Sequence, residues 1–308
     1  MRILRPSILF LSLFVGIMVA QAAGSSQQLS VLGGPIFNDR DKTSGSVMAE
    51  YSQPIQAPFS FSVSYLNEGH FDNHHRDGFI GQGWIGTNLS ETLSLRLGVG
   101  PYLYFDTTSA RRNSHGIGGI TSLDLQWSLS DNWVLDLRSS YILASRMNTI
   151  PLLVGLGYKF NSSDISTQQT SNRNELCVLL GISIVNNPGE SNGFAGSIEY
   201  RRNLWSHVDL TISYLNEGEN DEAKRQGIAA QLWVTQKLTD HISIGIGGGL
   251  YEAHDKYRHS SLNTNGIVSL TGSCRIYNNW FTRISWNRIV TSYDKDSDVV
   301  LVGLGYKF

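Results

Sequence analysis

The sequence predicts an all-β protein: a transmembrane antiparallel up-and-down β-barrel with 16 strands in two eight-strand repeats. Apolar and polar residues alternate along much of the chain, for example across residues 93–100, and this period-two pattern is typical of strands with one buried face. The chain also contains itself twice. Residues 64–69 return as residues 213–218, and residues 155–160 return as residues 303–308. Each repeat is therefore far larger than the unit of a solenoid.

Eight strands are expected in each repeat. Those of the first repeat lie near 28–37, 44–52, 58–67, 77–88, 91–106, 116–129, 132–145 and 150–160. Those of the second lie near 174–186, 192–203, 206–217, 225–238, 241–253, 264–277, 279–292 and 298–308. Most are about ten residues or longer, the length of a tilted strand that crosses a bilayer, and short connections alternate with long ones as in outer-membrane barrels. A soluble β-sandwich is the alternative.

Tryptophans add a second indication of a membrane protein. Trp133, Trp205 and Trp280 each follow a short turn, where an aromatic girdle would lie at the periplasmic interface. Trp84 and Trp233 occupy matching positions of the two repeats and are expected to point inward.

The composition excludes some classes of partner. The net charge of −2 argues against a nucleic-acid partner, and two cysteines are too few for a disulfide framework. No cofactor is expected.

Residues 1–22 have the pattern of a secretory signal peptide. Arg2 and Arg5 precede an apolar run over residues 8–20, which is too short to span a bilayer as a helix. Small residues at Ala20 and Ala22 suit a cleavage site, and an uncleaved anchor helix is the alternative. The expected organisation is a signal peptide at 1–22, a first repeat at 23–160, a periplasmic junction at 161–173 and a second repeat at 174–308.

The last strand resembles the C-terminal strand of Gram-negative outer-membrane proteins. The residues that carry this resemblance are Gly303, Gly305, Tyr306 and Phe308. The resemblance implies export to the cell outer membrane and recognition by the barrel-assembly machinery, with lipid and lipopolysaccharide as surroundings. The Asn-Glu-Gly motif at 67–69, followed by His-His-Arg-Asp-Gly at 74–78, is also similar to an uncharacterised group of proteobacterial outer-membrane proteins.

Sixteen strands can close as one wide barrel or as two narrow ones. The charged residues expected to point inward in the first repeat are Glu50, Arg96, Asp124, Asp136, Arg138 and Lys159. Those expected in the second are Glu199, Arg275, Arg283 and Lys307. Bases exceed acids in the second set, and unpaired charges are costly in a narrow, dry lumen. A single 16-strand barrel is therefore slightly favoured, although the junction is long for a periplasmic turn.

Histidines concentrate in the predicted external loops, most densely between residues 67 and 77. The candidate metal ligands there are His70, His74 and His75 with Asp72 or Glu68. Imidazole and carboxylate groups suit zinc or copper. The spacing matches no known ligand motif, so an ordinary solvated loop is the alternative.

Residues 259–263 (His-Ser-Ser-Leu-Asn) loosely resemble the His-x-Ser-Asn segment of outer-membrane lipid A deacylases, with a leucine inserted before the asparagine. The resemblance implies that His259 would take a proton from Ser261. Ser114 and His115 form the other candidate pair. The function expected from the sequence is that of a non-enzymatic barrel, either a passive pore or a structural and surface-interaction protein. The alternative is a lipid A or phospholipid acyl-ester hydrolase.

Overall fold

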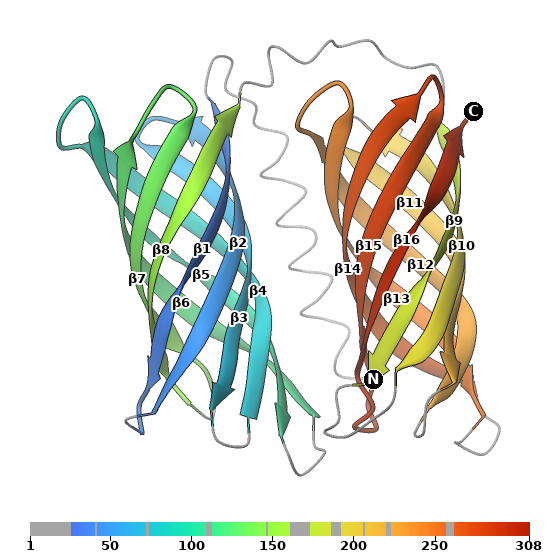
Figure 1. Ribbon diagram of the computed structural model, residues 1–308. Helices are drawn as coiled ribbons and strands as arrows, with labels where there is room; N and C mark the ends of the chain where they lie inside the picture. The colour runs from blue at the N-terminus through green and yellow to red at the C-terminus, as the bar shows by residue number, and fades with distance from the viewer. Residues whose placement is uncertain are drawn as a thin grey trace. The chain divides into compact units, whose positions relative to one another are not determined.

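The computed structural model describes residues 26–40, 42–71, 74–108, 113–145, 147–160, 173–185, 192–205, 207–219, 223–256 and 262–308. Within these residues the chain forms two closed antiparallel barrels (Figure 1). The first contains β1 (Gln27–Asn38), β2 (Thr43–Gln56), β3 (Phe59–Phe71), β4 (His74–Asn88), β5 (Leu93–Thr108), β6 (Asn113–Ser128), β7 (Trp133–Leu143) and β8 (Thr149–Phe160). The second contains β9 (Asn174–Val185), β10 (Gly193–Trp205), β11 (Val208–Glu219), β12 (Lys224–Lys237), β13 (Ile242–Asp255), β14 (Leu262–Tyr277), β15 (Trp280–Val290) and β16 (Ser297–Lys307). In this described part, no helix has the length and apolarity needed to cross a membrane.

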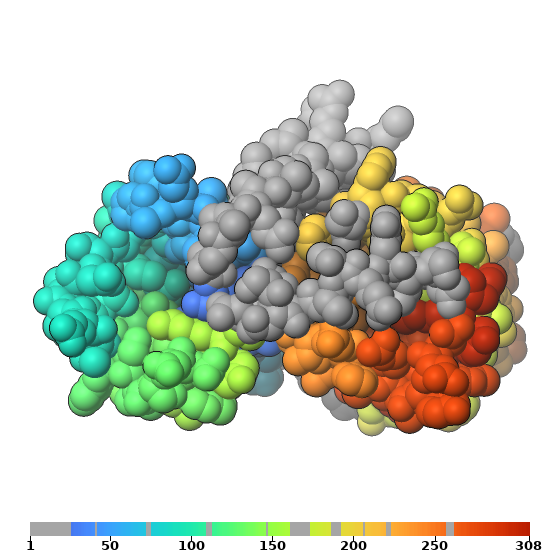
Figure 2. Space-filling view, turned by 90° about the horizontal axis from the view of Figure 1, so that it is seen from above, coloured from blue at the N-terminus to red at the C-terminus, as the bar shows by residue number. Residues whose placement is uncertain are grey.

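Each barrel closes through its own first and last strands. Gln27 of β1 lies opposite Phe160 of β8, and Glu175 of β9 lies opposite Lys307 of β16. In Figure 2 the residues of the first barrel are coloured blue to green, and those of the second are coloured yellow-green to red. The preference for a single 16-strand barrel is therefore wrong, and the chain forms two separate barrels of eight strands.

The error came from an incomplete set of inward charges in the second repeat. Glu175 and Asp209 also lie inside the second barrel, and they add two acids to the predicted set, in which bases exceeded acids. Glu175 Oε2 lies 2.5 Å from Arg283 Nη2, and its Oε1 lies 2.7 Å from Lys307 Nζ. Because opposite charges are paired within hydrogen-bond distance, a narrow interior can hold them without a wide water-filled channel.

All sixteen strands lie where the alternation predicted them, and β3, β4, β5 and β6 extend further than predicted at one end of the barrel. This end, called the hairpin end, carries the connections β1–β2, β3–β4, β5–β6 and β7–β8, and their counterparts in the second barrel. The opposite end, where β1 begins and β8 finishes, is called the terminal end. The predicted loop at 67–77 is mostly the hairpin of β3 and β4, and that at 106–115 is mostly β5 and β6. The predicted signal peptide and nearly all of the junction lie outside the described residues.

The outer faces of both barrels carry exposed apolar side chains. Val99 and Leu137 are 65% and 55% exposed in the first barrel, and Val302 and Leu304 are 58% and 56% exposed in the second. Trp133 packs edge-on against Tyr158 at the terminal end, with ring centres 5.2 Å apart, and an equivalent aromatic pair recurs in the second barrel. The alternation therefore places apolar residues outward around each barrel and polar residues inward.

The lumen of the first barrel is filled in layers, which can be followed along β4. From the terminal end inward, β4 contributes Trp84, Gln82, Ile80 and Arg76. All four side chains are at most 2% exposed. Ile80 belongs to an apolar layer formed by Leu32, Met48, Leu66, Ile80, Tyr102, Tyr104, Ile120, Ile142 and Leu153. A charged layer thus lies on each side of an apolar one.

Candidate functional site

The repeated Asn-Glu-Gly motif forms a β-bulge near the hairpin end of each barrel. Asn67 pairs with Asp77, but the next pair is His70 with His75, so β3 contains one extra residue. Gly69 adopts a positive φ of 71°, and its N–H donates to Asn67 Oδ1 at 2.8 Å. A Cβ at Gly69 would overlap a backbone carbonyl oxygen of β2, so glycine is required on both grounds.

The glutamate of the motif holds an arginine inside the first barrel. Arg76 donates from Nε and Nη2 to the two carboxylate oxygens of Glu68, at 2.7 Å each. Its Nη1 donates to the Met147 carbonyl at 2.7 Å, and Tyr102 and Thr149 each donate a hydroxyl to Glu68 at 2.7 Å. We call these five residues the first clamp. It joins the β3–β4 hairpin to the start of β8 across the lumen.

An equivalent second clamp lies in the second barrel. It consists of Glu217, Arg225, Tyr251, Lys295 and Ser297, each the counterpart of a residue in the first clamp. Arg225 Nη2 donates to Glu217 Oε2 at 2.6 Å and to Ser297 Oγ at 2.7 Å, and its Nη1 donates to the Lys295 carbonyl at 2.7 Å. Gly218 repeats the bulge with a φ of 75°. The duplicated motif is therefore the sequence signature of a duplicated buried ion pair.

Sequence reasoning did not identify the clamps, although a signal was present. A glutamate precedes an arginine by eight residues in both repeats, at Glu68 and Arg76 and again at Glu217 and Arg225. Glu68 had been considered as a metal ligand, but both of its carboxylate oxygens accept hydrogen bonds from Arg76. Its role is to pair with the arginine inside the barrel.

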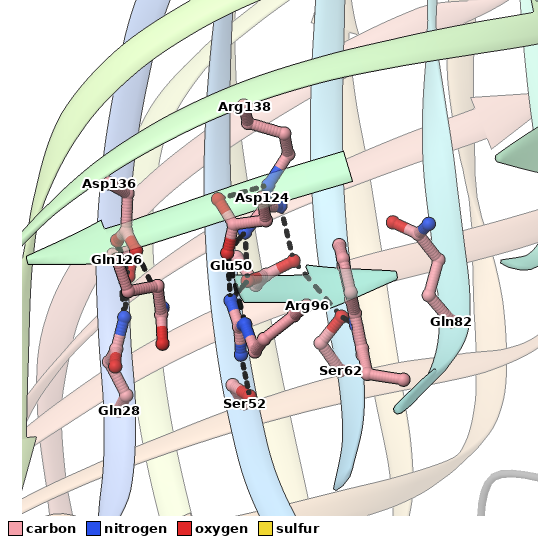
Figure 3. Close-up of polar contacts among 12 residues, drawn as sticks. Gln28, Glu50, Ser52, Ser62, Gln82, Arg96, Asp124, Gln126, Asp136 and Arg138 are labelled. Carbon is pink, nitrogen blue, oxygen red and sulfur yellow. Dashed lines mark hydrogen bonds and ion pairs between the residues drawn. The ribbon is translucent and has the colours of Figure 1, made fainter. Parts of the chain in front are cut away.

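A second charged network fills the terminal end of the first barrel (Figure 3). Arg138 donates from Nη1 and Nη2 to Glu50 at 2.7 Å each, and from Nε to Asp124 at 3.3 Å. Arg96 also pairs with Asp124. Arg96 and Arg138 each lie over the ring of Trp84, at 4.8 and 4.9 Å from its centre. The predicted inward positions of these charges and of Trp84 are confirmed.

Beside this network, Asp136 accepts three hydrogen bonds from neutral side chains. Its donors are Gln28 at 3.1 Å, Ser30 at 2.9 Å and Gln126 at 2.6 Å. Figure 3 shows Gln28, Gln126 and Asp136 as a group separate from Arg138 and its two acids. The terminal end of this lumen is thus closed by side chains that satisfy one another.

The second barrel has a different network at its terminal end. Arg283 pairs with both Glu199 and Glu175, and its Nε donates to Ser273 Oγ at 2.9 Å. Arg201 lies 3.2 Å from Glu199, and its guanidinium is 4.2 Å from the ring centre of Trp233. Glu199, Arg283 and Lys307 were predicted to point inward, whereas Glu175 and Arg201 were missed.

The candidate metal ligands are only partly brought together. The rings of His70 and His75 lie side by side, with centres 4.5 Å apart. His74 occupies the register position opposite Phe71, and Asp72 lies outside the described residues. Among the described residues, no cluster of three or more histidine, cysteine or acidic side chains is arranged to hold a metal ion.

The candidate hydrolytic residues gain no support from the structure. Ser114 and His115 are consecutive residues of β6, and consecutive side chains of a strand point to opposite faces. His115 instead lies beside Phe105, with ring centres 6.1 Å apart. His259 and Ser261 lie outside the described residues, so the hydrolytic hypothesis stays a prediction.

The proposed assembly signal lies on β16, the strand that closes the second barrel against β9. Gly303 and Gly305 both lie on the inward face of this strand, while Tyr306 and the final residue Phe308 are 40% and 52% exposed. Ring atoms of Phe281 occupy the space beside Gly305, where a Cβ would collide with them. The two glycines therefore have a packing role in addition to any role in recognition.

No protein-family model matches the chain, and no curated protein sequence matches it. Solved structures of similar fold include the attachment invasion locus protein Ail of Yersinia pestis, which is 15% identical, covers 44% of this chain and 97% of its own, and gives a TM-score of 0.33. Neisserial surface protein A is 13% identical, covers 44% of this chain and 96% of its own, and gives a TM-score of 0.36. The N-terminal β-barrel domain of Pseudomonas aeruginosa OprF is 11% identical, covers 44% of this chain and 97% of its own, and gives a TM-score of 0.34.

These three proteins are outer-membrane β-barrels, and the chain is similar to that class in fold.

Proposed function

We propose that the protein is a non-enzymatic outer-membrane protein, in which two sealed barrels hold stiffened hairpins at the cell surface. The observation that carries this proposal is closure at eight strands around a lumen filled by buried side chains. An eight-strand barrel is just wide enough for side chains to fill its interior. The barrels then serve as anchors, and the hairpin ends are the parts available for interaction.

The outer faces support placement in a membrane. Apolar side chains such as Val99 and Val302 are more than half exposed around both barrels, and a water-soluble protein rarely exposes a continuous apolar band of this kind. In a bilayer the same band would face lipid. The aromatic pairs Trp133–Tyr158 and Trp280–Tyr306 at the terminal ends then correspond to the interfacial girdle of outer-membrane barrels.

The lumen argues against the passive-pore alternative. An ion that entered the first barrel would have to cross the apolar layer, whose members Leu32, Ile80 and Ile142 are at most 1% exposed. It would also have to displace the first clamp at one side and the Arg138 network at the other. Separating a buried ion pair leaves an uncompensated charge, which costs about 3–5 kcal/mol.

The proposal places the hairpin end outside the cell and the terminal end in the periplasm. Lipopolysaccharide would then surround the hairpin end, and the barrel-assembly machinery would recognise the strand that ends at Phe308. Each clamp ties the long β3–β4 or β11–β12 hairpin to the β7–β8 or β15–β16 connection on the opposite side of the lumen. A hairpin fixed in this way loses less conformational entropy when it binds a partner than a free loop would.

Electrical recording on planar bilayers tests the sealed-barrel function. We expect no discrete conductance steps when the full mature chain is reconstituted, while a trimeric porin inserted in the same lipid provides the positive control. Correct insertion would be verified by the electrophoretic shift between heated and unheated samples. Reproducible steps from correctly folded protein would contradict the proposal and restore the pore.

A further inference from the structure

The two histidines of the first β3–β4 hairpin lie at cross-strand positions. His70 and His75 are paired in register, their ring centres are 4.5 Å apart and their ring planes are inclined by 42°. His70 is exposed and His75 is half-buried. A small ligand from solution could therefore reach the pair without entering the barrel.

The β-bulge is what brings these two rings together. Arg76 points into the lumen toward Glu68, so the preceding residue His75 belongs to the outward face of β4. Without the extra residue at Gly69, the alternation of β3 would place His70 on the inward face. Because the bulge shifts the alternation by one residue, His70 and His75 share the outward face.

The second barrel has a permanent ion pair at the same positions. Glu219 and Lys224 are the counterparts of His70 and His75, are paired in the same register after the same bulge, and form a salt bridge. The first barrel thus replaces two charges of opposite sign by two imidazoles. Two neutral imidazoles do not form an ion pair with each other, but each can donate a nitrogen lone pair to a cation.

We propose that His70 and His75 form a bidentate binding site for a first-row divalent metal ion, with copper(II) preferred. An ion about 2.0–2.1 Å from an imidazole nitrogen lies roughly 3.2 Å from that ring's centre. Two such rings at a right angle around the ion would have centres roughly 4.5 Å apart, the separation observed here. Neighbouring ligands at right angles are the geometry of tetragonal copper(II).

Copper(II) is also favoured by affinity. For a given set of nitrogen ligands, the binding strength of first-row divalent ions rises toward copper and is lower for zinc. Two imidazoles leave the remaining coordination positions to solvent or to an external ligand. The site would therefore bind the ion reversibly at the hairpin end and could present it to a partner.

The test is copper titration of the full mature chain, purified in detergent without a polyhistidine tag. Isothermal titration would give stoichiometry and affinity, and electron paramagnetic resonance would report the number of equatorial nitrogens. We expect one equivalent of Cu²⁺ with two nitrogen ligands. Loss of an outer-shell partner already weakens metal sites 10–100-fold, so His70→Ala and His75→Ala should each weaken binding by at least about tenfold.

The second barrel supplies matched controls. His254→Ala alters a histidine of β13 and should leave the high-affinity equivalent unchanged. The double substitution Glu219→His and Lys224→His recreates the pair in the second barrel and should add a second equivalent of Cu²⁺. This gain does not depend on any variant of the first hairpin being folded.

Two outcomes would overturn the inference. One is copper affinity that survives His70→Ala and His75→Ala, because another site would then be responsible. The other is a spectrum with two equatorial nitrogens that is unchanged by His75→Ala. Zn²⁺ titrated in parallel should bind more weakly than Cu²⁺, and the reverse order would contradict the tetragonal geometry.

Discussion

In the first barrel the arginines that stack on the inward tryptophan come from β5 and β7, whereas in the second barrel an arginine of β10 stacks on it. Arg96 lies 4.8 Å from the ring centre of Trp84, and Arg201 lies 4.2 Å from that of Trp233. The two tryptophans occupy equivalent positions and donate to equivalent hydroxyls of β3 and β11. Both tryptophans are therefore covered by a guanidinium group, but the strands that supply it differ between the barrels.

The change is an exchange between two positions of the repeat. Gly245 stands in β13 where the first barrel has Arg96, and Arg201 stands in β10 where the first barrel has Ser52. Arg96 Nη1 donates to Ser52 Oγ at 3.3 Å, so the two positions are in contact. This pair of facing positions therefore holds one arginine in each barrel, at one position in the first barrel and at the other in the second.

A second exchange moves the acid of an interacting pair from one of its two positions to the other. Gln28 and Asp136 are hydrogen-bonded in the first barrel at 3.1 Å. Their counterparts in the second barrel are Glu175 and Arg283, which lie 2.5 Å apart. The acid has moved from β7 in the first barrel to β9 in the second, and a base now stands on β15. The contact is retained although neither residue is.

A third exchange moves an aromatic ring near the hairpin end. Tyr104 contacts Ser145 in the first barrel, and the equivalent positions of the second barrel hold Ala253 and Tyr293. The large ring has moved from β5 to the connection between β15 and β16. Together the three exchanges indicate that volume and charge in a narrow lumen are constrained as a sum over facing strands, whereas single positions are free to change.

The largest expected difference between the barrels is the response to Arg138→Ala. This variant removes the cation that donates to both carboxylate oxygens of Glu50 and leaves only Arg96 beside Glu50 and Asp124, which should lower the free energy of unfolding by about 3–5 kcal/mol. The matched variant Ser285→Ala, at the equivalent position of the second barrel, removes one weak hydrogen bond and should cost about 1 kcal/mol or less.

Urea unfolding in lipid vesicles, followed by tryptophan fluorescence, would compare the two variants. Equal losses from Arg138→Ala and Ser285→Ala would mean that the network around Arg138 does not stabilise the first barrel more than a single hydroxyl does.

Transplanting the Glu175–Arg283 pair into the first barrel should sharpen the comparison. Asp136→Arg alone adds a cation to a lumen that already contains Arg96 and Arg138, so it should be strongly destabilising. Adding Gln28→Glu supplies the partner found in the second barrel, and the double-mutant cycle should give a favourable coupling of about 1–3 kcal/mol. The same urea titration on wild type, both single variants and the double variant measures this coupling, and a value near zero would show that the two positions diverged independently.

These exchanges also explain what the sequence could and could not predict. Alternation assigned Trp84, Glu50 and Arg138 to the inward face correctly, because facing is a property of one strand. It could not determine closure, because the partner of Arg138 is Glu50, which lies five strands earlier in the chain order but faces it across the lumen. At Arg201 the neighbouring residue is also an arginine, so alternation alone did not decide which of the two lies inside.

The candidate sites were also predictable only in part. The histidine pair was visible as a dense cluster, but its pairing depends on the bulge at Gly69, which inserts one residue and changes which side chains share a face. The clamps were visible only as a repeated spacing between a glutamate and an arginine. A glutamate and an arginine at this spacing form an ion pair only when both point into the same lumen. Predicting the pair therefore requires knowing where the hairpin between the two residues turns.

The smallest expected effect is that of cutting the chain between the barrels. Every strand pair in the described residues lies within one barrel, so a protease site inserted between residues 161 and 172 and cleaved after folding should remove no ladder hydrogen bond. We expect each half to keep its unfolding free energy within about 0.5 kcal/mol, the range of neutral surface changes.

Cleavage also allows the two barrels to be followed separately, by the electrophoretic mobility of each unheated fragment at increasing urea. In the cleaved protein, Arg138→Ala should shift only the fragment that begins before β1, and Ser285→Ala should leave both nearly unchanged. If Arg138→Ala lowered the stability of both fragments equally, the barrels would be coupled, and the exchanges between them could no longer be interpreted as independent solutions to filling one lumen.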